Sequence, residues 1–262
     1  MAIVGFIGTG NMGSALARAA AVNGKTERLL LANRSPEKAT RLAAELGGEV
    51  VDNREAAQQA QVLFLAVKPQ VLPEMFFSIK DILASRSDRF VLISMVAGYS
   101  LERLHGDFGP FPFVRIMPNI PVAVGGGVTL FCAGDDVTDD EKALVSELLS
   151  ASGFVSELEE SLLDAATGVT GCGPAFAAMF TEALADGAVA CGLPRPLALS
   201  YAAAMLRGTA DMLLKENLHP AVLKDRVCSP GGSTIQGVRC LEEDGFRAAV
   251  MDAVIATFEK EF

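Results

Sequence analysis

The chain has 262 residues, half of them hydrophobic, enough for one large domain or two smaller ones with a substantial core. Its formal net charge of −10 argues against nucleic-acid and anionic-membrane partners, because both require a basic surface. Five cysteines without a C-x-x-C pair and only two histidines argue against a disulfide framework and a metal site. With no signal-peptide pattern and no apolar run of membrane-spanning length, we expect a cytoplasmic protein without membrane segments.

The beginning of the chain has the pattern of a dinucleotide-binding fold. Residues 2–7 form an apolar run that predicts a buried strand, and an alanine-rich helix is predicted over residues 14–22. Between them lies Gly8-Thr9-Gly10-Asn11-Met12-Gly13, which matches the G-x-G-x-x-G fingerprint in the context that it requires. In this fingerprint Gly8 permits a tight turn and Gly10 lets the backbone approach a pyrophosphate. The sequence therefore predicts a cofactor pyrophosphate at this turn.

A second strand is predicted over residues 28–32, and the residues at its end choose between cofactors. An acidic residue there would bind the ribose 2′-hydroxyl of NAD, but Asn33, Arg34 and Ser35 are not acidic. Arg34 offers a guanidinium to the 2′-phosphate of NADP, with Asn33 and Ser35 as neutral donors. In the simpler interpretation Ser35 caps a helix that begins at Pro36 and Arg34 is solvated. The two interpretations are compatible, and we favour NADPH, with NADH as the alternative.

Strands and helices continue to alternate as far as residue 158. We predict strands at residues 49–51, 62–67, 89–94, 113–117, 127–132 and 154–157, a short helix capped by Asp52-Asn53, and a helix over residues 138–151. Ligands of such sheets bind beyond the carboxyl ends of the strands. Val67, Lys68 and Pro69, with Met95, Val96 and Ala97, are therefore expected to line the nicotinamide and its ribose. Taken alone, Lys68 is more simply an exposed residue at a strand end.

From residue 159 onward the pattern predicts only helices. They cover residues 162–170, 174–191 and, after Pro194 and Pro196, a segment that extends to residue 215. Many alanines line these segments, and small side chains allow close helix packing. The region is too thin to bury its apolar surface alone, so we expect a homo-oligomer. The predicted fold is α/β, with a Rossmann-type dinucleotide-binding domain at residues 1–158 and an all-α dimerisation domain at residues 159–262.

A turn near the C-terminus, Ser229-Pro230-Gly231-Gly232-Ser233-Thr234, runs into another predicted helix. Ser233 and Gln236 form an S-x-x-Q pattern, which predicts a capping box and a helix that starts there. The start of a helix presents unpaired N–H groups, and the three hydroxyl groups add further donors. The segment is therefore either an anion site or an ordinary helix start after a turn.

These motifs together resemble the pyrroline-5-carboxylate reductases of proline biosynthesis. The match runs through residues 5–12, 33–35, 66–69, 115–119, 171–176, 183–187 and 220–242. The last segment, which contains the S-P-G-G-S-T turn, is close to diagnostic. The resemblance implies NAD(P)H-dependent reduction of 1-pyrroline-5-carboxylate to L-proline, by dimers that are often gathered into pentamers of dimers.

The resemblance also implies roles for individual residues. The cofactor contacts are Ile7, Gly8, Thr9, Gly10, Asn11, Met12, Asn33, Arg34, Ser35, Asn53, Ala66, Val67, Lys68, Pro69, Met95, Val96 and Ala97. The substrate contacts are Glu160, Ser229, Gly231, Gly232, Ser233 and Thr234, and no metal is involved. Gly13 varies among family members and carries little weight. Arg226 stands where some members have Asn, and it is left out of the site.

In the implied reaction, a hydride moves from C4 of the nicotinamide to C5 of a cyclic imine. We interpret Thr234 as the catalytic residue that hydrogen-bonds the ring nitrogen, either relaying a proton or only orienting the substrate. Because both phosphate demands of the cofactor are met near the N-terminus, the anion facing residues 229–234 is interpreted as the substrate carboxylate. Ser229 and the backbone N–H groups of Gly232, Ser233 and Thr234 would bind it.

Two other functions compete with this interpretation. A 3-hydroxyacid dehydrogenase has the same two-domain plan, but its family uses a lysine on the long inter-domain helix, and no lysine lies between Gly168 and Leu193. A non-catalytic NADPH sensor would need the fingerprint without a second anion site, which the turn at residues 229–234 opposes.

Overall fold

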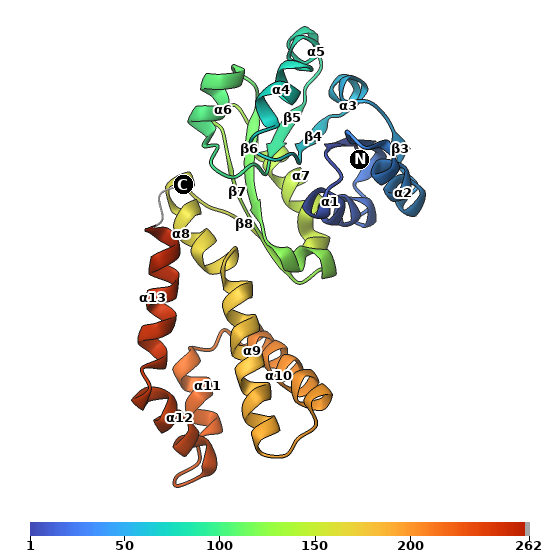
Figure 1. The fold of residues 1–262 in the computed structure, drawn as a ribbon. Coiled ribbons are helices and arrows are strands. Elements are labelled where there is room, and N and C mark those ends of the chain that lie inside the picture. The colour runs from blue at the N-terminus through green and yellow to red at the C-terminus, as the bar shows by residue number, and fades with distance from the viewer. Residues whose placement is uncertain (260–262) are drawn as a thin grey trace. The chain divides into compact units, whose positions relative to one another are not determined.

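The computed structural model describes residues 1–259, and the chain divides into two compact units (Figure 1). The first unit extends from Met1 to Gly171, and the second begins at Cys172. Among the described residues, no helix has the length and apolar character needed to cross a bilayer, and no group of three or more His, Cys, Asp or Glu side chains is placed to hold a metal ion.

The first unit is built on an eight-stranded sheet in the order β3-β2-β1-β4-β5-β6-β7-β8. The strands are β1 (Ala2–Ile7), β2 (Thr26–Ala32), β3 (Glu49–Val50), β4 (Val62–Leu65), β5 (Val91–Ser94), β6 (Phe113–Pro118), β7 (Gly127–Ala133) and β8 (Gly153–Glu157). All neighbouring pairs are parallel except β6 and β7. The order of the first six strands is that of the Rossmann fold, which confirms the predicted fold class.

Helices cover both faces of this sheet (Figure 1). They are α1 (Asn11–Val22), α2 (Pro36–Leu46), α3 (Asn53–Gln59), α4 (Leu72–Phe77), α5 (Lys80–Ser85), α6 (Leu101–Phe108), α7 (Asp139–Leu149) and α8 (Glu160–Thr170), with short 3-10 helices η1 (Ile120–Val124) and η2 (Ser150–Ser152). One core packs α1, α2 and α7 on the sheet, and a second packs α3, α4, α5 and α6 on its other face. Because both faces are covered, strands such as β4 and β5 are buried along their whole length.

All eight predicted strands are present, with ends shifted by at most two residues. The predicted cap at Asp52 is also confirmed, because its carboxylate accepts from Glu55 N at 2.8 Å and the Glu55 carboxylate accepts from Asp52 N at 3.2 Å. The sequence patterns predict none of α4, α5 and α6. These helices have six to eight residues, too few for a clear helical period.

The second unit contains only helices among its described residues. They are α9 (Gly173–Ala190), α10 (Arg195–Lys215), α11 (Pro220–Val227), α12 (Ser233–Glu243) and α13 (Phe246–Phe258). The predicted helices at 174–191 and ending at 215 are confirmed as α9 and α10, which pack against each other. Fully buried side chains are few and small, and α12 and α13 have none.

Helix α8 packs with the sheet. Its Leu163 is fully buried against Leu130 and Cys132 of β7. The change from strands to helices falls where the sequence predicts it, because β8 ends at Glu157 and every described element after it is a helix. The first compact unit nevertheless includes α8, so the assignment of residue 159 as the start of a separate domain stays a prediction.

Candidate active site

The glycine turn after β1 leads directly into the first turn of α1. Gly10 is the N-cap, and Ser14 N donates to Gly10 O at 2.8 Å as the first bond of the helix. The N–H groups of Asn11, Met12 and Gly13 therefore precede any intrahelical acceptor. These donors, with the positive end of the helix dipole, form a site suited to a pyrophosphate.

The glycines of this turn differ in what surrounds them. Gly8 has φ +107°, and a Cβ on it would overlap the carbonyl of Ala66. A Cβ on Gly13 would overlap the carbonyl of Gly8, so Gly13 is constrained although the resemblance gives it little weight. A Cβ on Gly10 would meet no atom within 4 Å. The turn is tight on the side of the protein and open at Gly10, which fits a bound dinucleotide.

The end of β2 is tied to the glycine turn. Asn33 Oδ1 accepts from Thr9 N at 3.0 Å, and Asn33 Nδ2 donates to Ser35 O at 2.9 Å. Asn33 therefore connects the two loops and uses one of the two N–H groups of its side-chain amide for this. Ser35 is the N-cap of α2, as the simpler interpretation predicts, but its side chain makes no capping hydrogen bond. Arg34 is exposed beside it.

A hollow of about 360 Å³ lies between the start of α1 and α2. Its lining includes Thr9, Gly10 and Asn11 of the turn and two exposed cations of α2, Lys38 and Arg41. Neither cation is among the cofactor residues predicted from the sequence. Their three-residue spacing places them on one face of α2 near the predicted 2′-phosphate residues, and this spacing was the available signal.

The segments predicted to line the nicotinamide lie at the same edge of the sheet. Ile7 is in register with Leu65, and Leu65 is in register with Ser94, so the loops after β1, β4 and β5 begin side by side. These loops carry Gly8 to Met12, Ala66 to Pro69 and Met95 to Ala97. The strand order reverses between β1 and β4, which is the ligand-binding crevice of this fold.

Two of the predicted cofactor residues at this edge of the sheet, Lys68 and Asn53, differ in their exposure. Lys68 is exposed after β4, which also agrees with its simpler interpretation as a strand-end residue. Asn53 is half-buried as the first residue of α3.

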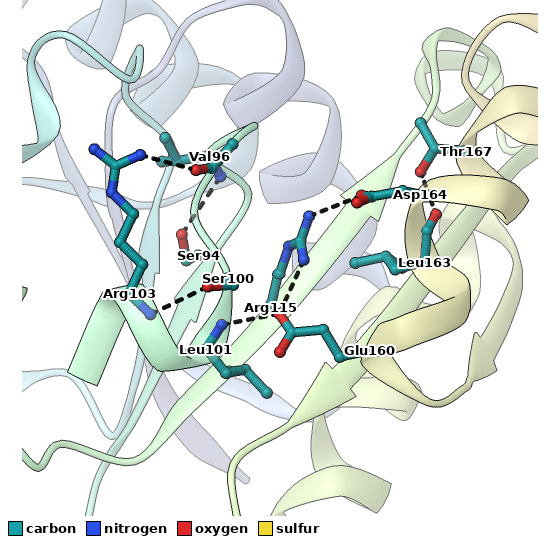
Figure 2. Close-up of polar contacts among 11 residues, drawn as sticks. Ser94, Val96, Ser100, Leu101, Arg103, Arg115, Glu160, Leu163, Asp164 and Thr167 are labelled. Carbon is teal, nitrogen blue, oxygen red and sulfur yellow. Dashed lines mark hydrogen bonds and ion pairs between the residues drawn. The ribbon is translucent and has the colours of Figure 1, made fainter. Parts of the chain in front are cut away.

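Glu160 lies in a polar cluster that Figure 2 shows in close-up. Its Oε1 is 2.9 Å from Nη1 of the buried Arg115 and accepts from Leu101 N at 2.8 Å, while Asp164 Oδ1 is 3.3 Å from Arg115 Nη2. The neighbouring Cys132 is unsuited to act as a nucleophile, because burial, followed by the negative charge of Glu160, raises the pKa of its thiol to about 11. Arg115 is not among the predicted site residues, although a charged residue within the apolar run of β6 indicates a buried charge that needs a partner.

The turn at residues 229–234 belongs to the second unit. Helix α12 begins at Ser233 as predicted, but the predicted capping box is wrong, because the N-cap is Gly232 and Ser233 already occupies the first helical position. Gly231 has φ +70°, and Gly232 N donates to Ser229 O at 3.0 Å. This tight turn frees the first N–H groups of α12, and Ser229, Ser233 and Thr234 are exposed beside them.

Arg226 forms an ion pair with Glu216 at 3.1 Å. Its guanidinium thus has a carboxylate partner within the same unit, and its omission from the predicted site stays a prediction.

Comparisons with known proteins cover both units. Residues 160–261 match the family described as pyrroline-5-carboxylate reductase dimerisation, and residues 3–98 match the family described as NADP oxidoreductase, coenzyme F420-dependent. The pyrroline-5-carboxylate reductase of Synechocystis sp. is 46% identical over 209 residues, which are 80% of this chain and 77% of that protein. The chain belongs to the pyrroline-5-carboxylate reductase family.

Solved structures of the reductase family have the same fold. The pyrroline-5-carboxylate reductase of Coxiella burnetii matches with a TM-score of 0.92 at 30% identity, covering 98% of this chain and 96% of that one. The pyrroline carboxylate reductase of Plasmodium falciparum, solved with NADP bound, matches with a TM-score of 0.84 at 32% identity and the same coverage. The resemblance stated from the motifs is thereby confirmed.

Proposed function

We propose that this chain reduces 1-pyrroline-5-carboxylate to L-proline with NAD(P)H as its cofactor, the last step of proline biosynthesis. The observation that carries the proposal is the presence of both family features in one chain. The first unit has a glycine turn that is open at Gly10, and the second has a helix start surrounded by free donors. A dinucleotide sensor would need only the first of these features.

The first unit binds the cofactor in this proposal. The N–H groups at the start of α1 hold the pyrophosphate, and Arg34 with Ser35 holds the 2′-phosphate, which favours NADPH over NADH. Asn33 acts by holding Thr9 and Ser35 in place, as its two hydrogen bonds indicate. Asn53 and the loops at residues 66–69 and 95–97 contact the rest of the dinucleotide. When bound, the dinucleotide supplies a hydride from its nicotinamide ring.

The substrate is a cyclic imine with a carboxylate, and its protonated form is already a strong electrophile. Ser229 and the N–H groups of Ser233 and Thr234 bind the carboxylate, whereas the N–H of Gly232 donates to Ser229 O and, with Gly231, shapes the turn. The Thr234 hydroxyl hydrogen-bonds the ring nitrogen, which keeps the imine carbon in a fixed orientation. The side-chain carboxylate of Glu160 makes an additional contact with the substrate.

The helical region from residue 159 onward is proposed as the substrate-binding and dimerisation domain, and residues 1–158 as the cofactor domain. The exposed apolar side chains of α9 to α13 support a homo-oligomer, as a dimer or a pentamer of dimers. The acidic composition supports a cytoplasmic protein that does not bind nucleic acid.

A comparison of two substrates tests the proposal. The purified chain is mixed with NADPH, and the loss of NADPH absorbance is followed after adding either 1-pyrroline-5-carboxylate or succinic semialdehyde. We expect oxidation with the imine and none with the oxoacid. Oxidation with succinic semialdehyde alone would indicate a 3-hydroxyacid dehydrogenase, and no oxidation with either would indicate a sensor.

A further inference from the structure

Arg115 is a charged residue in the interior of the sheet. It lies on β6, in register with Ser94 at the end of β5 and with Cys132 of β7, and its side chain is only 7% exposed. Removing a guanidinium from water is costly unless partners of opposite charge compensate. The arrangement of its partners therefore indicates what the side chain does.

The partners of Arg115 are two carboxylates of α8 with different exposure. Glu160 is 28% exposed and lies 2.9 Å from Nη1, whereas Asp164 is 74% exposed and lies 3.3 Å from Nη2. Solvent screens the exposed pair more strongly than the half-buried one. The interaction with Glu160 is therefore the stronger of the two, and Asp164 is an auxiliary counter-charge.

The hydrogen bonds of Glu160 all fall on one of its two oxygens. Oε1 accepts from Arg115 Nη1 and from Leu101 N, and no described residue donates to Oε2 (Figure 2). Leu101 N belongs to the first turn of α6, where helical N–H groups have no intrahelical acceptor. Two donors from two elements fix the rotation of the carboxylate, so that Oε2 remains available as an acceptor.

The loop at residues 95–97, proposed to contact the nicotinamide, ends four residues before Leu101. The cluster thus connects β6, the start of α6 and α8 at the edge of the sheet where the loops after β1, β4 and β5 meet.

We infer that Arg115 is a positioning residue, which holds Glu160 so that its free oxygen faces the positively charged ring nitrogen of a cyclic imine. The inference rests on the proposed function, in which Glu160 contacts the substrate. An acceptor oxygen held in place favours an iminium, which carries an N–H donor, over a ketone or aldehyde, which has none. Arg115 itself does not touch the substrate and acts through Glu160.

A double-mutant cycle tests whether Arg115 acts through Glu160. The variants are Arg115→Met, Glu160→Gln and the two combined, and kcat/KM for 1-pyrroline-5-carboxylate is measured at saturating NADPH. We expect each single change to lower kcat/KM on the order of 10- to 100-fold, as misplacement of a contact group does. The second change should then add less than about 3-fold to the first.

Control variants separate positioning from general loss of structure. Arg89→Met removes another Arg–Glu pair of the first unit, at 2.7 Å from Glu141, and should leave kcat/KM unchanged. Arg115→Lys keeps the charge without the planar fork and should recover part of the activity, which also keeps the test open if Arg115→Met does not fold. The dissociation constant for NADPH should stay the same in all variants.

Two results would overturn the inference, and they are distinguishable. If the unaltered chain is active and the effects of the two single changes multiply in full, Arg115 acts independently of Glu160 and only this inference fails. If the unaltered chain does not reduce 1-pyrroline-5-carboxylate, the proposed function fails and this inference fails with it.

Discussion

The two units of the chain differ in how they bury apolar surface. In the first unit, two cores on the two faces of the sheet enclose large side chains such as Phe6, Phe64 and Phe76. Among the described residues of the second unit, the buried side chains are Ala185, Ala198, Ala202 and Leu223, while large apolar side chains such as Met179 and Leu214 are exposed. The first unit therefore has a complete core of its own, whereas the second does not, and we propose that a second copy supplies the missing apolar surface.

The division extends to chemistry in our proposal, with the cofactor bound by the first unit and the substrate carboxylate by the second. Four predictions test this division, in order of decreasing effect.

The largest effect is expected from Gly8→Ala. Gly8 has φ +107°, which alanine rarely adopts, and the new Cβ would overlap the carbonyl of Ala66. We therefore expect the first unit to lose about 3 kcal/mol of stability and to stop binding NADPH. Gly10→Ala is the matched control, because its Cβ meets no protein atom within 4 Å. It should weaken NADPH binding while stability falls by only about 1 kcal/mol, the cost of alanine in place of glycine at the N-cap of α1. Thermal melting and fluorescence titration measure the two quantities, and equal melting temperatures for both variants would contradict the account.

The next effect concerns assembly. Met179→Glu places a charge on a side chain of α9 that is 69% exposed in the single chain. If a second copy covers this surface, the change should shift the mass measured by light scattering to that of a monomer and strongly reduce activity. Val22→Glu changes a side chain of α1 in the first unit that is equally exposed, at 71%, and should alter neither property. An unaltered oligomer with Met179→Glu would show that this surface is free.

A smaller effect is expected from Thr234→Ala in the second unit. Thr234 is exposed at the start of α12, so its removal should not affect folding. Loss of the hydrogen bond to the ring nitrogen should lower kcat by about 100-fold, while the dissociation constant for NADPH stays the same. Thr234→Ser keeps the hydroxyl and should retain most of the activity. An unchanged kcat in Thr234→Ala would exclude the catalytic role.

The smallest effect is expected from Arg34→Ala in the first unit. Its guanidinium should contribute about 1.5–3 kcal/mol to binding of the 2′-phosphate, so KM should rise at least about 10-fold for NADPH and stay constant for NADH. Arg28→Ala, on β2 before this loop, removes a cation that pairs with Glu49 at 2.8 Å and should change neither KM. Steady-state kinetics with both cofactors measure the preference. A parallel rise in both KM values after Arg34→Ala would place the 2′-phosphate elsewhere.

Sequence patterns predicted the sheet well because buried parallel strands are short, continuous apolar runs bounded by turns. Residues 62–67 illustrate this, since the run is too short for a typical buried helix, and the strand there is β4 (Val62–Leu65). Helices α4, α5 and α6 could not be predicted in this way, because each is shorter than three turns.

At the candidate site, local motifs predicted the loops, but contacts between distant residues could not be read from the sequence. The Asn33–Thr9 and Arg115–Glu160 contacts join residues 24 and 45 positions apart, and only the fold brings these partners together. The capping box at Ser233 was wrong for a related reason. The S-x-x-Q pattern fits either register of a helix start, and the turn from Ser229 to Gly232 decides between them.

In the proposed reaction, this chain forms L-proline from 1-pyrroline-5-carboxylate with NADPH as the reductant. The most direct measurement follows NADPH absorbance and L-proline in the same reaction mixture, with the proline quantified by chiral chromatography. The account predicts that one L-proline forms for each NADPH consumed and that none forms without the enzyme. Consumption of NADPH without formation of proline, or no consumption at all, would contradict it.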